Sequence, residues 1–150
     1  MNVGPGITAE FPVLTDEQMA SVARRGTRHH TTAGEVLYSS GDRGYDFIVI
    51  EAGEVDVLRP AMPNAPEVLI ATWGPGRFLG ELNLLTGQSA IATARVRAPG
   101  VVHRIAPAQF RELMAADAEV SDLVLRVLLA RRQSLRQGEG ARTLEILGSQ

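Results

Sequence analysis

The chain has 150 residues, 45% of them hydrophobic and 21% charged, which predicts one soluble globular domain large enough to form its own core. It contains no cysteine, which excludes disulfides, thiolate chemistry and cysteine zinc sites and is compatible with a cytoplasmic location. The net charge of −2 gives no reason to expect nucleic acid as a partner, and the lack of an apolar run of about 20 residues argues against a membrane span.

The N-terminal part of the chain predicts a loose arm followed by a short helix. Residues 1–10 are rich in glycine and proline and show no periodicity, so we expect no regular structure there. Thr15 and Gln18 have the spacing of a capping box, in which each side chain binds the backbone of the other. This pair predicts a helix that begins at Thr15 and ends near Gly26.

Between Thr27 and Arg104 short aliphatic runs alternate with glycine and proline turns. Such spacing predicts an all-β sandwich, roll or barrel. Ala52-Gly53 predicts a tight hairpin between two of the runs, and Pro99-Gly100 predicts a turn between the last two. The predicted strands are Glu35–Tyr38, Asp46–Glu51, Glu54–Arg59, Glu67–Thr72, Ala92–Arg97 and Val101–Ile105.

Two helices are predicted after Ala106. Pro107 suits the first turn of one helix, and a second is expected from near Asp117 to about Gln137. The apolar stripe of the second helix is wider than one contact requires, which slightly favours a homodimer through this helix. Its arginines are interpreted as a solvated face, and the fourteen residues after the last of them are too few for a helix-turn-helix DNA reader. These arginines are Arg126, Arg131, Arg132 and Arg136.

The segment from Phe78 to Thr93 organises the functional prediction. It places Gly80 and Glu81 before one apolar turn and leaves through Gly87, which predicts a loop, a single helical turn and a second loop leading into a strand. Free backbone amides near Gly80 would make this segment a candidate anion site. In a purely structural interpretation, Glu81 stabilises the start of the helical turn and the glycines serve turn geometry alone.

Three segments, in order and spacing, resemble the cyclic nucleotide-binding domain family between about Phe11 and Arg136. Ile50–Val57 resembles that family's hairpin signature, Phe78–Leu85 the opening of its phosphate-binding cassette, and Ala94–Ala98 the strand that leaves the cassette. The resemblance implies a mainly β fold with flanking α-helices. The expected architecture is a cyclic nucleotide-binding-like β-roll (double-stranded β-helix) with one N-terminal and two C-terminal helices. It would occupy residues 11–137, with 138–150 as a linker or the start of a following domain.

The resemblance also implies a non-catalytic regulatory module that binds cyclic AMP or cyclic GMP and shifts the closing helices, which would act on an attached domain. Gly80 would permit close backbone approach, and Glu81 would accept a hydrogen bond from the ribose 2′-hydroxyl. Amides near Leu82 and at Ser89 and Ala90 would face the cyclic phosphate. The expected ligand-binding residues are Phe78, Leu79, Gly80, Glu81, Leu82, Ser89, Ala90, Ile91, Ala92, Thr93 and Arg95.

One departure from the family pattern concerns the arginine that follows the cassette turn. Counting from Gly80 puts Ala90 at its position, and counting back from the next strand puts Ala92 there. A charge-assisted hydrogen bond contributes roughly 1.5–3 kcal/mol, and each 1.4 kcal/mol is about tenfold in affinity. Phosphate binding should therefore be weakened by at least about one to two decades, or lost, unless Arg77 or Arg95 compensates.

Other interpretations of the chain follow from the same residues. A fold that has lost its ligand would serve as a protein-interaction or dimerisation domain. The cassette and the tail Thr143–Ser149 are similar to bacterial proteins that join this domain to a thioredoxin-reductase-like flavoprotein, which predicts a larger redox enzyme as the parent. No metal site is expected, because the adjacent His29 and His30 would face opposite sides of a strand and His103 is alone.

Overall fold

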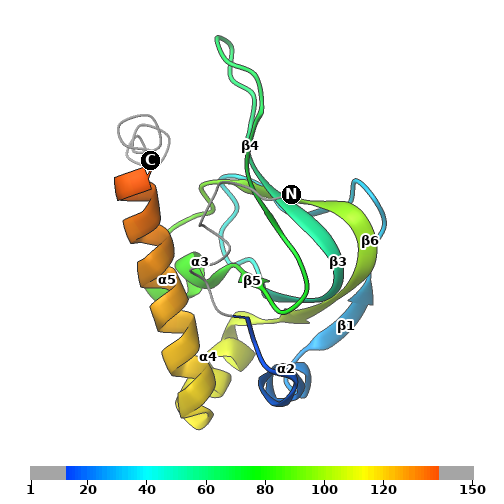
Figure 1. The fold of residues 1–150 in the computed structure, drawn as a ribbon, viewed down its shortest axis with the longest axis vertical. Coiled ribbons are helices and arrows are strands. Elements are labelled where there is room, and N and C mark those ends of the chain that lie inside the picture. The colour runs from blue at the N-terminus through cyan, green and yellow to red at the C-terminus, as the bar shows by residue number, and fades with distance from the viewer. Residues whose placement is uncertain (1–12, 139–150) are drawn as a thin grey trace.

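The computed structural model describes residues 13–138, so the predicted arm at 1–10 and the tail Thr143–Ser149 lie outside the described residues. Six strands form one antiparallel sheet in the order β1-β6-β3-β4, with β2 paired to β6 and β5 paired to β3, and this sheet curls into a β-roll (Figure 1). Helices flank the roll, which confirms the predicted fold class. The elements are α2 (Asp16–Ala23), β1 (Thr27–His30), β2 (Val36–Tyr38), β3 (Phe47–Arg59), β4 (Val68–Trp73), β5 (Phe78–Leu79), α3 (Glu81–Thr86), β6 (Thr93–Ile105), α4 (Pro107–Ala116) and α5 (Ala118–Gly138).

The first helix begins as its capping box predicts. The Gln18 amide donates to Thr15 Oγ1 at 3.1 Å, and the Thr15 amide donates to Gln18 Oε1 at 2.9 Å. Two amides that have no partner within the helix are thereby satisfied. The helix ends at Ala23, earlier than the predicted end near Gly26.

The predicted turns at Ala52-Gly53 and Pro99-Gly100 are wrong, because each lies inside a continuous 13-residue strand, β3 or β6. The two strands pair along their length, with register shifts near Ala52 that let them bend together. A Cβ atom on Gly53 would lie 2.6 Å from the Ala98 carbonyl oxygen, and one on Gly100 would lie 2.0 Å from the Ala52 oxygen. These glycines therefore allow the bent backbones to touch and do not end the strands.

Two apolar clusters hold the fold together. One fills the roll, and the other joins the roll to the helices. Alternation along β3 sends Phe47 and Val49 to the helices and Ile48 and Ile50 into the roll, and all four are fully buried. The strand predicted at Asp46–Glu51 is thereby confirmed as the first part of β3. The roll cluster consists of Leu37, Ile48, Ile50, Val55, Ala71, Trp73, Leu79, Ala94, Val96 and Val102.

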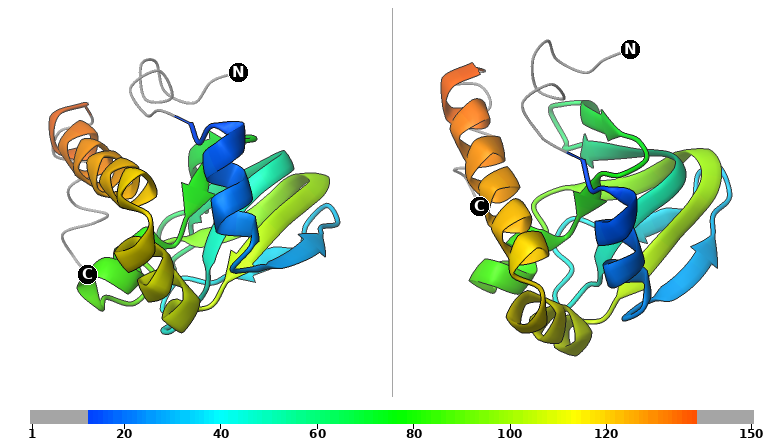
Figure 2. Two further views of the ribbon diagram at one scale, coloured as in Figure 1. Left: turned by 90° about the horizontal axis from the view of Figure 1, so that it is seen from below. Right: turned by 60° about the horizontal axis from the view of Figure 1, so that its bottom comes forward.

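The helices cover one side and one end of the roll. Helix α5 runs along the side beside α3, while α2 and α4 lie at the same end (Figures 1 and 2). Ser21 Oγ on α2 donates to Asp117 Oδ2 at 2.7 Å, and Asp117 Oδ1 accepts the Val120 amide at 3.1 Å, so one carboxylate joins α2 to the start of α5. No helix among residues 13–138 is long and apolar enough to cross a membrane.

Candidate functional site

The candidate site begins at the short strand β5, which pairs with β3 through Phe78 and Leu79. Gly80 follows with φ +94°, and a Cβ atom there would lie 2.5 Å from the Asp46 carbonyl oxygen. The fold itself therefore requires glycine at position 80. Helix α3 starts directly after it at Glu81. The predicted loop, helical turn and second loop are confirmed, except that the first loop contains this two-residue strand.

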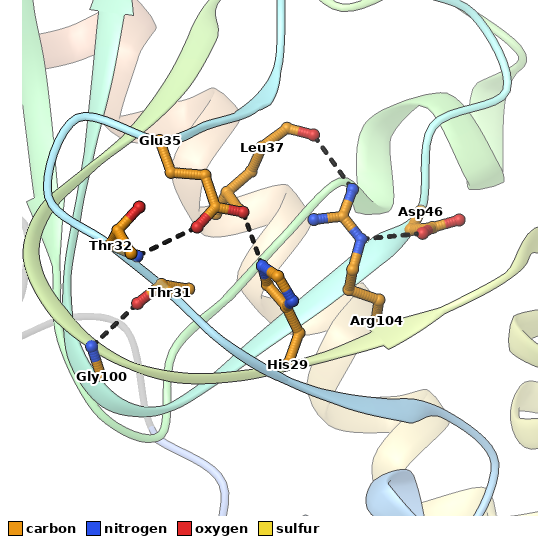
Figure 3. A network of polar contacts seen from close by, with 8 residues as sticks. All are labelled: His29, Thr31, Thr32, Glu35, Leu37, Asp46, Gly100 and Arg104. Atoms are coloured by element: carbon orange, nitrogen blue, oxygen red, sulfur yellow. Dashed lines mark hydrogen bonds and ion pairs between the residues drawn. The ribbon is translucent and has the colours of Figure 1, made fainter.

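A polar network holds the loop that contacts Gly80 (Figure 3). Arg104 Nε lies 3.2 Å from Asp46 Oδ2, and its Nη2 donates to the Leu37 carbonyl at 3.2 Å. Nearby, His29 Nε2 and Glu35 Oε2 are 2.5 Å apart, and this hydrogen bond is the main reason that the pKa of Glu35 is lowered. His29 is thus part of this network. Among the described residues, no group of three or more histidine, aspartate or glutamate side chains could hold a metal ion.

Glu81 is the central side chain of the site and is only 5% exposed. Its Oε2 accepts a hydrogen bond of 2.9 Å from Arg131 Nη1, and Arg131 Nη2 donates to the Phe78 carbonyl at 2.9 Å. The guanidinium also lies over two rings, 4.8 Å from the centroid of Trp73 and 5.3 Å from that of Phe78. A residue of α5 thereby binds the first residue of α3, the helix that lies beside it in Figure 1.

The second carboxylate oxygen of Glu81 has no such partner. Oε1 is buried and accepts no hydrogen bond from the described residues. A buried acceptor in this state costs about 1–3 kcal/mol, which a donor from a ligand would recover. Burial and the Glu81 carboxylate raise the pKa of Tyr38, whose ring stacks on Tyr45 at 4.6 Å, so Tyr38 stays neutral at ordinary pH.

In the segment expected to bind phosphate, two of the expected ligand-binding groups already form hydrogen bonds within the chain. Ala90 and Ala92 are buried, at 4% and 7% exposure. The Ala90 amide, expected to face a phosphate, donates to the Asp42 carbonyl at 2.9 Å, and Thr93 Oγ1 accepts the Ser40 amide at 3.0 Å. Both groups therefore hold the β2–β3 loop. The remaining residues of the expected set are placed as follows: Leu82 in α3, and half-buried Ser89 and Ile91 in the loop before β6.

The two arginines named as substitutes differ in position. Arg95 lies on the outer face of β6, where both its chain neighbours are buried in the roll, and its guanidinium binds Glu67 at 2.8 and 3.2 Å. It therefore points away from the interior. The Arg77 guanidinium lies 5.7 Å from the Trp73 ring centroid, and burial together with the nearby Arg131 charge lowers the pKa of Arg77.

Arg131 is the site residue that the sequence interpretation missed. Its assignment to a solvated face is wrong, since its side chain is 15% exposed, whereas Arg126 is 60% exposed and pairs with Asp122 on the same helix. The apolar spacing contained the signal. Buried Val124 and Val127 on α5 lie seven and four residues before Arg131, which therefore continues the inward stripe.

Comparisons with known proteins agree with this geometry. Residues 28–117 match the sequence profile of the cyclic nucleotide-binding domain. An uncharacterised NTE family protein of Mycobacterium tuberculosis is 24% identical over 135 residues, which cover 90% of this chain and 22% of the relative. Patatin-like phospholipase domain-containing protein 6 of Mus musculus is 30% identical over 92 residues, which cover 61% of this chain and 7% of the relative. The chain thus spans about a fifth or less of these curated relatives.

Solved structures show the same architecture. A structure from work on a cyclic-GMP-dependent signalling pathway in bacterial phytopathogenesis is 25% identical with a TM-score of 0.68, covering 81% of this chain and 96% of that one. The Thermus thermophilus catabolite activator protein is 23% identical with a TM-score of 0.63, covering 90% and 61%. The regulatory domain of Toxoplasma gondii PKA with cAMP is 22% identical with a TM-score of 0.60, covering 76% and 41%. The last two, below 25% identity, support the fold alone.

Proposed function

The chain belongs to the cyclic nucleotide-binding domain family, and from this premise we propose that it is a non-catalytic regulatory module that binds a ribose-containing ligand of the cyclic nucleotide class with reduced affinity. The observation that carries the proposal is the buried Oε1 atom of Glu81, which accepts no hydrogen bond from the described residues. A ligand hydroxyl that donates to this atom would remove the cost of an unsatisfied buried acceptor. The Glu81 carboxylate therefore fits the ribose part of a cyclic nucleotide.

Reduced affinity is proposed because the phosphate part of the ligand finds fewer partners. Alanine stands at both candidate positions of the family arginine, Ala90 and Ala92, and the Ala90 amide already donates to Asp42. Arg95 is bound to Glu67 outside the roll. Without a charge-assisted contact worth roughly 1.5–3 kcal/mol, affinity for the phosphate should fall by at least about one to two decades.

Calorimetric titration with cyclic AMP and cyclic GMP tests the proposal. We expect weak binding by the wild type and a further loss for Glu81→Gln, whose amide nitrogen would place a donor where an acceptor is needed. Glu67→Gln is the matched control, because it makes the same chemical change on the outer surface. Absence of heat at millimolar ligand would exclude the cyclic nucleotide function, and equal affinities of the two variants would exclude the role of Glu81.

A second candidate function is a protein-interaction or dimerisation domain that no longer uses a ligand. The observation that favours it is that Glu81 Oε2 and the Ala90 amide are both engaged within the chain. The contact face would be on α5, where Leu125 and Leu129 are 43% and 63% exposed. Light scattering after gel filtration tests it: a dimer that Leu129→Glu converts to a monomer supports this function, and a monomeric wild type contradicts the homodimer.

We also propose that the module acts on an attached domain. The relatives carry the matching segment within much longer proteins, among them an NTE family protein and a patatin-like phospholipase domain-containing protein. The sequence resemblance predicts a thioredoxin-reductase-like redox domain, and the cysteine-free composition predicts a cytoplasmic location. Sequencing of the complete reading frame tests the redox prediction, which fails if a hydrolase-like or transporter-like segment follows.

A further inference from the structure

We propose that the preferred ligand of the site around Glu81 is a neutral ribonucleoside, which lacks the phosphate of a cyclic nucleotide. This inference deepens the proposed function, on which it rests for the contact between Glu81 and a ribose hydroxyl. It starts from a difference between the two halves of the cassette. The first half keeps a buried acceptor, Glu81 Oε1, that accepts no hydrogen bond from the described residues, whereas residues 88–93 in the second half include no charged side chain. A ligand that has the hydroxyl and lacks the negative charge fits both halves.

The negative charge of Glu81 is already balanced within the chain. Arg131 Nη1 donates to Glu81 Oε2 at 2.9 Å, and the Glu81 and Arg131 side chains are 6% and 15% exposed. Because this pair is neutral as a whole, Oε1 can accept a hydroxyl without any change in the net charge of the site. In a cyclic nucleotide the phosphate is attached to the sugar carbon next to the one that bears the 2′-hydroxyl. It would therefore bring a second negative charge near the carboxylate, and burial of an unpaired charge is unfavourable.

The second half of the cassette is apolar or already hydrogen-bonded at the two positions of the family arginine. Ala90 and Ala92 are 4% and 7% exposed. The Ala90 amide donates to the Asp42 carbonyl at 2.9 Å, and the Ala90 carbonyl accepts the Gly41 amide at 2.7 Å. The loop that pairs with Ala90 carries one carboxylate, on Asp42, and one exposed guanidinium, on Arg43. This loop therefore adds no net positive charge for a phosphate.

Arg77 lies at a different part of the sheet. Its guanidinium is 5.7 Å from the ring centroid of Trp73 in β4, and the guanidinium of Arg131 lies over the same ring at 4.8 Å. Ala90, in contrast, pairs with the loop that follows β2, and the order of the strands separates β2 from β4 by the β3–β6 ladder. We therefore expect Arg77 to affect the binding of nucleosides and of cyclic nucleotides alike.

A ribonucleoside offers neutral groups where a cyclic nucleotide has its phosphate. Its 3′ and 5′ oxygens are hydroxyls, each of which can both donate and accept a hydrogen bond. The oxygens of a phosphate are strong acceptors and need donors. Since the Ala90 amide already donates to the Asp42 carbonyl, a ligand group that can also donate suits this segment better.

Calorimetric titration of the wild type with adenosine, guanosine and their 3′,5′-cyclic monophosphates tests the inference. We expect at least one nucleoside to bind about tenfold or more tightly than its cyclic monophosphate. The 2′-deoxy form of that nucleoside should bind at least about tenfold more weakly, because it lacks the donor for Glu81. Nucleosides that bind no more tightly than their cyclic monophosphates overturn the inference, and so does a 2′-deoxy form that binds equally well.

Two substitutions test the physical cause, one for each register of the family arginine. Ala90→Arg and Ala92→Arg restore a cation to the second half, so at least one of them should raise the affinity for the cyclic nucleotide relative to the nucleoside by about tenfold or more. The matched control is Ala108→Arg on the exposed surface of α4, which should leave the ratio of the two affinities within about twofold of the wild type. An unchanged ratio in both folded variants overturns the inference. If neither variant folds, the comparison of ligands on the wild type still decides it.

The variant Arg77→Gln tests whether another cation takes the place of the family arginine. We expect it to change the affinities for the nucleoside and for the cyclic nucleotide by the same factor. A loss of about tenfold or more for the cyclic nucleotide alone would mean that Arg77 binds the phosphate, and the inference would be overturned.

The inference and the proposed function can fail separately. If the cyclic nucleotides bind and the nucleosides bind no more tightly, the proposed function stands and the inference is overturned. If a nucleoside binds and the cyclic nucleotides give no heat at millimolar concentration, the cyclic nucleotide function is excluded and the inference stands. If none of these ligands binds, both are refuted.

Discussion

Replacement of Gly80 by alanine should destabilise the domain more than the same change at Gly87. Both glycines have positive φ, +94° and +78°, which costs an alanine about 1–2 kcal/mol, partly offset by about 0.4–1 kcal/mol from the stiffer unfolded chain. At Gly87 no atom lies within 4 Å of the added Cβ, whereas at Gly80 it would lie 2.5 Å from the Asp46 carbonyl oxygen. Overpacking of this kind adds about 1–3 kcal/mol.

Urea denaturation followed by circular dichroism measures the difference directly. With m-values of about 1–3 kcal/mol per molar urea, the midpoint of Gly80→Ala should lie on the order of 1 M below that of Gly87→Ala. The comparison cancels most of the backbone term, since both positions have positive φ. Equal midpoints would mean that the Asp46 loop yields to a side chain, and the claim that the fold requires glycine at position 80 would be wrong.

Three further changes test the frame around the site. Asp117→Ala removes the acceptor of the Ser21 hydroxyl and the Val120 amide and should lower the free energy of unfolding by about 1–2 kcal/mol in urea at pH 7. These bonds lower the pKa of Asp117 from its ordinary 3.8, so their contribution to stability is present above pH 3.8 and is lost as pH falls through the folded pKa. The difference in unfolding free energy between Asp117→Ala and the wild type must therefore narrow in acid. A difference that stays constant with pH would contradict this reasoning. Phe110→Ala, at a residue 1% exposed, should cost about 3–5 kcal/mol by the same assay, and a loss below about 1 kcal/mol would refute its core role. Gly100→Ala would bring its Cβ within 2.0 Å of a carbonyl oxygen on the facing strand and should lower the thermal midpoint by several degrees, with wild-type melting as the contrary result.

The sequence was sufficient for the parts of the fold that local chemistry determines. The capping box of Thr15 and Gln18, the helix that starts at Pro107 and the apolar run from Phe47 to Ile50 all have the predicted structure. Each depends on residues a few positions apart, where propensity and periodicity act directly. The order of the cassette motifs was sufficient for the fold family.

Contacts between distant residues explain what the sequence did not predict. Glycine beside proline or a small residue usually indicates a turn. At Gly53 and Gly100, however, glycine is needed because the backbone of the facing strand lies too close for a side chain. The sequence near each glycine does not show which strand will face it. Arg131 looked like its exposed neighbour Arg126 because both are cations on one helix. What distinguishes them is Glu81, fifty positions earlier in the chain.

The two long strands also affect how the domain folds and where it can move. Each strand crosses both halves of the roll, and their register pairs Ile48 with Arg104 and Leu58 with Thr93. The ladder between β3 and β6 can therefore form only when the two ends of the long intervening segment have come together. Closing such large loops costs entropy before any pairing repays it, which predicts a slow folding step in the range of about milliseconds to seconds. Once formed, the ladder resists piecemeal opening, since β3 and β6 run through both halves of the roll. Motion within the folded domain is thereby left to the helices, which can shift against a frame that opens only as a whole.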